Sequence, residues 1–361
     1  MTTTFDTKLD SENPIITDAH YREVKIPKYK LVGGREVIKG YRTLSIPCEQ
    51  LMEMQRELLH SLQNCREANT SNVAHAFMPN RSIKTMAVRH VDKPTVIRID
   101  IKDFFPSINP QMLRDAMIDA GYPNKLIRRA LQICFYKGGL PQGAPTSPML
   151  SNSVGRMIDK RIIGLCKKWR RVNPSRKASY RVRHADGKTT RVQNDRIAEI
   201  NYSRYADDLV FSSTYTGLTH IIKPVRHILH RCGFKVNYRK INVNRQSSRQ
   251  VVCGITVNEK LSKPKPYRKK VRSMIHNIIT DNAYQRCPKG HYIDRVTREV
   301  KPINFQKLNG LVAHITDICN EQGNKLHQLL AILNEVLNVD RENWSHHTND
   351  YLRRHPNVLF V

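Results

Sequence analysis

Apolar and polar positions alternate in some stretches of the chain and recur at helical spacing in others. Residues 21–47 alternate around several glycines, which predicts a β-hairpin or a small sheet. Residues 51–62 place leucine and methionine side chains on one face of a predicted helix. The same spacing predicts helices over residues 110–134, with breaks near Gly121 and Pro123, over residues 148–169 and over residues 218–232.

Two predicted strands carry acidic residues where an ordinary strand would end. The first runs from Val96 and includes Asp100. The second stretch, residues 200–212, holds Asp207 and Asp208 between two short apolar runs, so a tight strand–turn–strand would place both carboxylates at its tip. Adjacent carboxylates repel, and a hard divalent cation such as Mg²⁺ removes the repulsion through oxygen ligands. A solvated Asp-Asp turn is the alternative for such a pair taken alone.

Residues 167–196 form a strongly basic segment between the predicted helix that follows Asn152 and the predicted strand that carries Tyr205. They hold eleven lysines and arginines but only two aspartates. The positions alternate about Asp186-Gly187, a pair typical of hairpin turns. We interpret the segment as an inserted hairpin that contacts a nucleic-acid backbone through Arg181, Arg183, Lys188 and Arg191. A solvated loop is the alternative.

Composition narrows the partners and the compartment. The 361 residues carry a formal net charge of +30, which favours a polyanion, first nucleic acid and second an anionic membrane surface. No apolar run approaches the length of a membrane span, and the first residues do not resemble a signal peptide. Eight scattered cysteines fit reduced thiols. We therefore expect a cytoplasmic protein without membrane contact.

The character of the chain changes after Lys263, where a basic helix is expected through Ile279. An exposed hairpin is expected over residues 292–303, and apolar-faced helices over residues 308–315 and 326–337. Cys287 and His291 have a spacing that could bind zinc, but no second Cys/His pair lies nearby.

Three motifs, taken in order, resemble retron-type bacterial reverse transcriptases of the group II intron and retron-like family. They are DIKDFFPSI from Asp100, LPQGAPTSPMLSN from Leu140 and YSRYADD from Tyr202. The resemblance implies an α+β right-hand polymerase with fingers, a ferredoxin-like palm and a helical thumb. It implies a lead-in and fingers over residues 1–95, a palm over 96–262, with 112–147 contributing to the fingers and 167–196 inserted, and a thumb and tail over 263–361.

The resemblance also implies the catalytic residues. Asp100, Asp207 and Asp208 would be catalytic and would hold two Mg²⁺ ions, with Mn²⁺ possible, and the backbone carbonyl of Ile101 would be a further ligand. Phe105 occupies the position of the ring that excludes a ribose 2′-hydroxyl. Lys240 could donate a proton to the leaving pyrophosphate, although it could equally face a phosphate or solvent.

The remaining nucleotide and nucleic-acid contacts follow from the same resemblance. Arg42, helped by Lys39, would face the triphosphate, and the main chain at Asp103 would meet it. The residues expected to bind the nucleotide are Lys39, Arg42, Asp103, Phe104, Phe105, Gln142, Gly143 and Lys240. Lys269, Lys270 and Arg272 of the basic helix would grip a duplex through its backbone.

Together these features predict an RNA-directed DNA polymerase. By resemblance it would copy a cognate structured noncoding RNA from dNTPs into single-stranded DNA, leave an RNA–DNA hybrid, and act in antiphage defence with a separate effector protein. Two departures from the retron pattern, Met86 for Asn and Cys253 for Thr, keep open a non-retron defence-associated or group II intron-like reverse transcriptase. A catalytically silent RNA-binding protein is disfavoured because all three aspartates are present. His90 is predicted to be a hydrogen-bonded core histidine.

Overall fold

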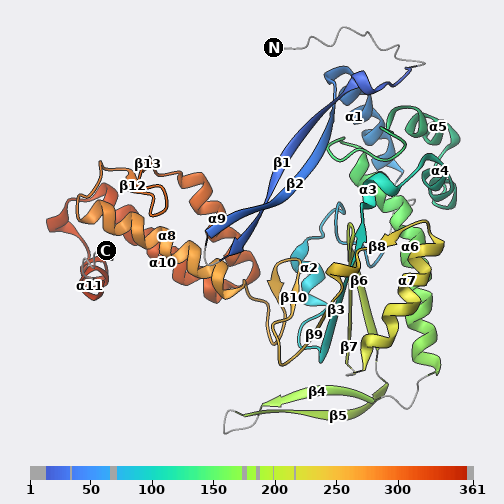
Figure 1. The fold of residues 1–361 in the computed structure, drawn as a ribbon. Helices are drawn as coiled ribbons and strands as arrows, with labels where there is room; N and C mark the ends of the chain where they lie inside the picture. The colour runs from blue at the N-terminus through green and yellow to red at the C-terminus, as the bar shows by residue number, and fades with distance from the viewer. Residues whose placement is uncertain are drawn as a thin grey trace. The chain divides into compact units, whose positions relative to one another are not determined.

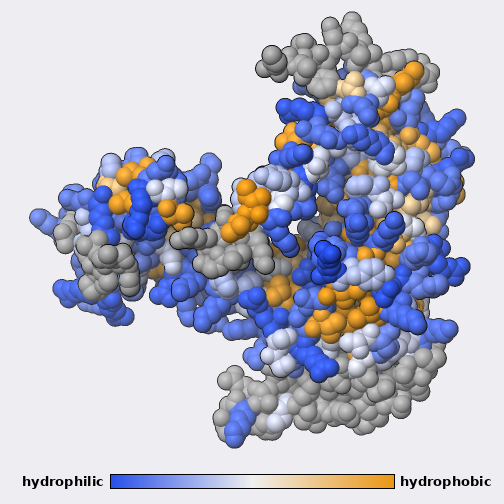
Figure 2. All heavy atoms as spheres, in the orientation of Figure 1, coloured by the Kyte–Doolittle hydropathy of each residue, from blue (hydrophilic) through white to orange (hydrophobic). Residues whose placement is uncertain are grey.

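The computed structural model shows a mixed α+β chain (Figure 1). It describes residues 14–32, 35–65, 71–172, 177–183, 188–197, 199–214 and 217–355. The chain divides into two compact units, residues 1–250 and 251–361. Hydrophilic residues cover much of the visible surface, as the net charge of +30 leads one to expect (Figure 2).

The first unit is built around a five-stranded antiparallel sheet with β3 (Thr95–Lys102) at its centre. β7 (Asp208–Ser213) pairs with β3 and also with the outer strand β6 (Ile200–Tyr205). The short strands β8 (Lys235–Val236) and β9 (Asn242–Arg245) also pair with β3, and the turn η4 (Tyr238–Lys240) lies between them.

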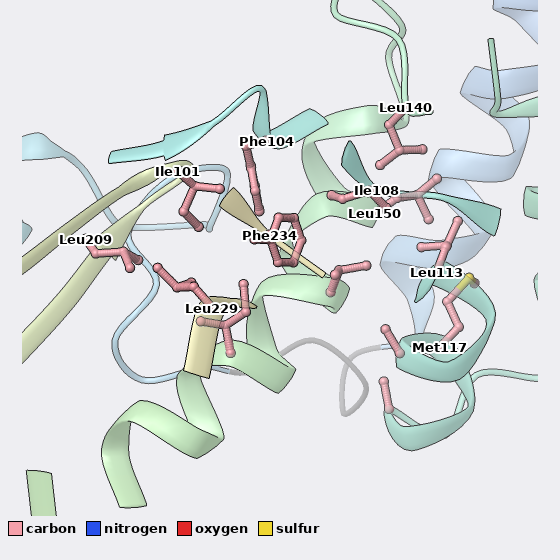
Figure 3. Close-up of a cluster of buried hydrophobic side chains, with 14 of the residues drawn as sticks. Ile101, Phe104, Ile108, Leu113, Met117, Leu140, Leu150, Leu209, Leu229 and Phe234 are labelled. Carbon is pink, nitrogen blue, oxygen red and sulfur yellow. The ribbon is translucent and has the colours of Figure 1, made fainter. Parts of the chain in front are cut away.

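The two faces of this sheet differ in chemistry because strand side chains alternate. Ile97, Ile99 and Ile101 are buried on one face, in the main core of the unit. Two helices, α6 (Ser147–Val172) and α7 (Ile222–Arg231, preceded by η3, Leu218–Ile221), lie beside the sheet (Figure 1). Their apolar side chains belong to the same core. Figure 3 shows Ile101, Leu209, Leu229 and Phe234 within it. The opposite face carries Arg98 and Asp100.

The remaining elements of the first unit precede or interrupt the sheet. β1 (Tyr21–Val32) and β2 (Arg35–Pro47) form a separate two-stranded ribbon, so the predicted hairpin is confirmed; its Gly33-Gly34 turn lies outside the described residues. The predicted helix over residues 51–62 and the break near Gly121 are also confirmed. The short elements are η1 (Asp18–His20), α1 (Glu49–Asn64), α2 (Ile83–Val88), α3 (Phe104–Ser107), α4 (Pro110–Asp119) and α5 (Asn124–Ile133).

The basic segment forms the hairpin that the sequence predicts. β4 (Lys177–Arg183) pairs antiparallel with β5 (Thr189–Ile197), and Arg181 lies opposite Arg191. Lys188 is exposed. The Asp186-Gly187 turn and the side chains of Arg181, Arg183 and Arg191 lie outside what the structure describes.

The second unit is mainly helical. α8 (Lys265–Ala283), α9 (Phe305–Ile318), α10 (Asn320–Asn338) and α11 (His346–Arg354) surround their own apolar core. Short elements complete it, namely β10 (Val251–Val252), β11 (Ile255–Thr256), β12 (His291–Ile293), β13 (Val300–Pro302) and η5 (Arg341–Asn343). The predicted hairpin over residues 292–303 and the later helices are confirmed. No helix of the described ranges is long and apolar enough to cross a membrane.

A buried ion pair joins α6 to β6. Arg204 and Asp159 are both almost inaccessible, and the guanidinium meets the carboxylate through Nε–Oδ1 and Nη2–Oδ2 contacts of 2.9 Å each. Tyr202 and Ser71 donate hydroxyl hydrogen bonds of 2.7 and 2.6 Å to the same carboxylate. A Cβ atom at Gly155 would lie 2.4 Å from the guanidinium carbon, so α6 needs a glycine there. The pair therefore fixes β6 against α6.

Arg204→Met should lower the free energy of unfolding by about 3–5 kcal/mol, because it leaves the Asp159 carboxylate buried without a counter-charge. Chemical denaturation measures the loss. Arg156→Met is the matched control: Arg156 lies on α6, as Asp159 does, and pairs at 3.4 Å with the more exposed Asp119 of α4, so its loss should change stability by less than about 1 kcal/mol. Equal effects of the two substitutions would contradict the assignment.

Candidate active site

The turn between β6 and β7 presents the Asp-Asp pair. Tyr205 pairs with Asp208, so Ala206 and Asp207 form the turn itself. Ala206 has a φ of 53°, which non-glycine residues adopt infrequently. Such a conformation persists only where the surroundings hold it, and residues of this kind cluster at functional sites. The predicted strand–turn–strand is therefore confirmed, with Asp207 in the turn.

Asp100 on β3 lies beside this turn. It is the cross-strand partner of Asp208, and the Ile101 amide donates a 3.0 Å hydrogen bond to the Asp207 carbonyl. Residues far apart in the sequence thus bring three carboxyl groups to one edge of the sheet. The polymerase motifs predict this gathering, and the strand register produces it.

Two basic side chains contact the carboxylates of Asp100 and Asp208. Lys240 Nζ lies 2.8 and 3.0 Å from the two oxygens of Asp100, and Arg98 Nη2 lies 3.3 and 3.2 Å from those of Asp208. Sequence reasoning missed Arg98. Its signal is the strand register: Arg98 is two residues before Asp100 on one face of β3, which makes it the diagonal cross-strand neighbour of Asp208.

Within the described ranges the Asp207 carboxylate forms no salt bridge. Burial, followed by repulsion from Asp208 and Asp100, raises the pKa of the Asp207 carboxyl to about 6, although the charge of Lys240 lowers it. Among the described residues, no three His, Cys, Asp or Glu side chains already converge as metal ligands, and the Asp100 and Asp208 carboxylates instead contact Lys240 and Arg98. The donor chemistry nevertheless fits a hard divalent cation, because all three groups offer carboxylate oxygens and their charges repel without one.

The residues after Asp100 separate into one core ring and one accessible ring. Phe104 is only 2% exposed, and its ring centre lies 5.5 Å from that of Phe234 in the core. Its side chain is therefore a core residue, so that the predicted contact of Phe104 with a nucleotide could come only from its main chain. Phe105 is half-buried, with its ring edge-to-face against exposed Phe77 at 6.3 Å. Asp103, with a φ of 47°, is exposed at the start of α3.

The loop at Gln142 and Gly143 lies along the edge of β2. The Ser45 amide donates a 2.7 Å hydrogen bond to the Gln142 carbonyl, and a Cβ at Gly143 would lie 3.1 Å from the Ser45 carbonyl oxygen. The missing Cβ of Gly143 lets the backbone of β2 approach the loop closely. Arg42 and Lys39 are both exposed on that strand.

The two departures from the retron pattern have local structural settings. Met86 is fully buried in α2, and Cys253 forms the tight β10–β11 turn with Gly254, at φ values of 46° and 76°. His90 is fully buried, and its Nδ1 lies 2.7 Å from the Ser212 hydroxyl, so the predicted core histidine is confirmed. Burial lowers the pKa of His90 to about 3. The other singled-out histidine, His291, accepts a contact from the Cys287 thiol through its carbonyl.

The second unit carries a cationic groove of about 820 Å³ between α8, α10 and α11. Lys269 and Arg272 line it, as do Lys265, Arg268 and Lys325, over a floor that includes Leu329 and Ile332. Lys270 is exposed but does not line the groove. Two of the three residues expected to grip a duplex therefore share one concave surface.

Asp207→Asn should raise the free energy of unfolding at pH 7, in metal-free buffer, by about 1–3 kcal/mol. The folded-state pKa of about 6 exceeds the ordinary value of 3.8, so the folded state binds more protons and loses stability as the pH rises between these values. The substitution removes that loss, and the difference should disappear below the lower value. Denaturation across this pH range measures it. Asp115→Asn, at an exposed carboxylate on α4, should have little effect on the free energy of unfolding. If the wild type were as stable as Asp207→Asn at pH 7, the Asp207 carboxyl would not destabilise the folded state, and the prediction would be wrong.

Comparison with known proteins agrees with this geometry. Residues 26–268 match the family described as reverse transcriptase (RNA-dependent DNA polymerase). The apo telomerase of Candida tropicalis superposes with a TM-score of 0.44 and 12% identity, covering 88% of this chain and 59% of that one, which is too weak a likeness to support a conclusion.

Several curated relatives are retron enzymes. The chain is 32% identical over 276 residues to the Retron Mx65 reverse transcriptase of Myxococcus xanthus, covering 71% of this chain and 56% of that protein. For the Retron Mx162 enzyme of the same organism the identity is 26%, with 72% and 53% covered, and for the Retron Ec86 enzyme of Escherichia coli it is 27%, with 72% and 69% covered. The match thus spans about half the length of the two M. xanthus relatives. The chain belongs to the reverse transcriptase family, and the curated relatives that it resembles are retron reverse transcriptases.

Proposed function

We propose that the chain is an RNA-directed DNA polymerase. The observation that carries the proposal is the pairing of Asp100 with Asp208 beside the Asp207 turn, which gathers three carboxylates at the edge of the sheet. Nucleotidyl transfer needs an activated 3′-hydroxyl and a neutralised leaving pyrophosphate, and two bound divalent ions, Mg²⁺ or alternatively Mn²⁺, supply both. The family match supports the same activity.

The residues of the chain divide the work at this edge. Asp100 and Asp207 would hold the ions, Asp208 would complete the ligand set, and the Ile101 carbonyl would add a further oxygen. Arg98 limits the negative charge by its contact with Asp208 at 3.2 Å. The Lys240 side chain is 59% exposed while Asp100 is 11% exposed, so the lysine can leave the carboxylate and meet a phosphate or donate a proton to the leaving group.

The incoming nucleotide would lie between this edge and the β1–β2 ribbon. Exposed Arg42 and Lys39 would contact the triphosphate, together with the main chain at Asp103 and Phe104. Phe105 would exclude a ribose 2′-hydroxyl. Gln142 and Gly143 would border the nascent base pair from their position beside Ser45.

The nucleic acid would contact two basic surfaces. The β4–β5 hairpin, with Arg181, Arg183, Lys188 and Arg191, would bind the phosphates of a structured RNA, and the groove that Lys269 and Arg272 line would grip a duplex, with Lys270 beside it. By the resemblance, residues 1–95 would form the fingers and residues 96–262 the palm, of which residues 251–262 belong to the second unit, and the thumb over residues 263–361 would include the basic helix α8. The finer division rests on the resemblance.

The retron resemblance supports a specific product. We infer that the enzyme copies a structured noncoding RNA into single-stranded DNA that stays joined to RNA, and that it serves antiphage defence with a separate effector protein. Sequencing of the nucleic acid that co-purifies with the protein tests this. A branched RNA–DNA molecule supports the retron reading, and unbranched or absent DNA favours the group II intron-like or other defence-associated enzymes.

Asp207→Ala and Asp208→Ala should each abolish primer extension on an RNA template with Mg²⁺, because these side chains hold metal. RNA affinity should stay nearly unchanged, since neither contacts template. Asp115→Ala, which removes an exposed carboxylate from α4, is the control and should extend normally. Extension by both variants at more than about a few per cent of the wild-type rate would refute the assignment, and a wild type that binds RNA without extension would leave a silent RNA-binding protein.

Phe105→Ala should raise the incorporation of ribonucleotides relative to deoxynucleotides by about tenfold or more, because a smaller side chain no longer clashes with the 2′-hydroxyl. Competition between rNTP and dNTP in primer extension measures the ratio. Phe305→Ala, at an exposed ring in the second unit, is the control. An unchanged ratio would make Phe105 a packing residue.

A further inference from the structure

The outer half of the β1–β2 ribbon displays tyrosines on one face. The register pairs Lys25 with Thr43, Pro27 with Tyr41 and Tyr29 with Ile38, and directly paired side chains share a face of the sheet. We call these six residues the tyrosine face. A register shift after Lys28 leaves Lys39 unpaired, so that Ile38 stands opposite Tyr29. Arg42, paired with Ile26, lies on the other face.

The tyrosine face is exposed where the ribbon leaves the rest of the unit. Tyr29 and Tyr41 are each 59% exposed and Ile38 is 49% exposed, whereas Tyr21 at the base of the same face is 5% exposed and packs on Tyr136. Among the described residues, the side chains of Tyr29 and Tyr41 form no hydrogen bond and have no ring partner. Exposed aromatic groups gathered in this way commonly mark a binding surface.

The charge around the tyrosine face indicates which class of molecule would bind there. Lys25 is exposed on the tyrosine face and Lys39 is exposed at its register shift, while Lys28 and Arg42 are exposed on the other face of the same narrow ribbon. The described acidic side chain of β1, Glu23, is already paired with Lys137 at 2.8 Å. Positive charge beside exposed rings fits a single-stranded nucleic acid, whose phosphates meet the cations and whose bases stack on the rings. An acidic protein surface would use the charges but not the two open ring faces.

The tyrosine face continues from the loop that borders the proposed nucleotide pocket. Ser45 lies on this face, since it pairs with Glu23. Its amide donates the hydrogen bond to the Gln142 carbonyl at the edge of β2. Tyr41 is four residues further along the strand, a distance of about 13 Å at strand spacing. A template strand that approaches the nascent base pair along β2 would therefore pass Tyr29 and then Tyr41 while its bases are still unpaired.

We propose that Tyr29 and Tyr41 form a stacking platform for unpaired bases of the RNA template before they enter the polymerase site. The identification of that strand as a template rests on the proposed function; the capacity to bind single-stranded RNA does not. Each tyrosine holds one base by stacking, and Lys25, one pair nearer to Ser45 than Tyr41 is, contacts the phosphate on that side of Tyr41. The binding is independent of base sequence because every base offers a π face.

Fluorescence anisotropy with labelled single-stranded adenosine and uridine RNA homopolymers, without metal or dNTPs, tests the proposal. Tyr29→Leu and Tyr41→Leu should each weaken binding by about 5- to 100-fold, the loss expected for one stacked base, with the salt dependence unchanged. Tyr29→Phe and Tyr41→Phe keep the ring and should bind as the wild type does. Lys25→Ser should instead flatten the salt dependence.

Ile26→Ala is the matched control, because Ile26 is 45% exposed on the opposite face and should not affect binding. Leucine variants that bind as the wild type does, or an equal loss with Ile26→Ala, would overturn the proposal. So would light scattering that shows the wild type as a dimer and the leucine variants as monomers, since a second copy would then cover the rings. Primer extension on a template without an overhang reports the polymerase separately, so failure of one conclusion does not imply failure of the other.

Discussion

The position of the Asp-Asp turn depends on the buried ion pair between Arg204 and Asp159. A charge with almost no access to water must be matched in place, so the pair tolerates little movement between β6 and α6. Arg204 also donates to Asn152 Oδ1 at 3.1 Å, and Asn152 donates to the Ala76 carbonyl at 2.8 Å. These contacts hold the strand that ends two residues before Asp207, which explains how a turn with an unfavourable backbone conformation keeps one geometry.

At the sheet edge that carries Asp100, Asp207 and Asp208, like charges are not fully matched, in contrast to the buried ion pair. Three acids are brought together where folding alone would separate them, and the cost appears as the pKa of about 6 at Asp207. Arg98 and Lys240 offset part of the repulsion, but they differ in mobility: Arg98 lies on the central strand, while the Lys240 side chain is largely exposed. The site thus sacrifices some stability to stay open to a cation, as functional sites commonly do.

Sequence reasoning predicted the elements and the acidic motifs because these depend on local pattern. The ribbon, the break near Gly121 and the turn at Asp207 all follow from spacing and turn chemistry. It could not assign side chains whose role depends on register or burial. Arg98 reads as an ordinary strand position until β7 is placed beside it. The residue pattern does not show that the Phe104 ring is in the core while the Phe105 ring is accessible, and Arg204 reads as a surface residue although it is fully buried.

In the β1–β2 ribbon, too, the residue pattern does not predict the strand register, and the register decides which side chains face a partner. Alternation assigns Arg42 and Tyr41 to opposite faces, but only the register shift beyond Lys28 decides what stands opposite Tyr29. With regular pairing that residue would be Lys39, and the face would be half ionic. The extra residue moves Lys39 out of the pairing and puts Ile38 in its place, because a one-residue slip exchanges the two faces of a strand. The ribbon can therefore present cations to a triphosphate on one face, and on the other the neighbouring rings of Tyr41 and Tyr29 with Ile38 to bases, next to the cation Lys25.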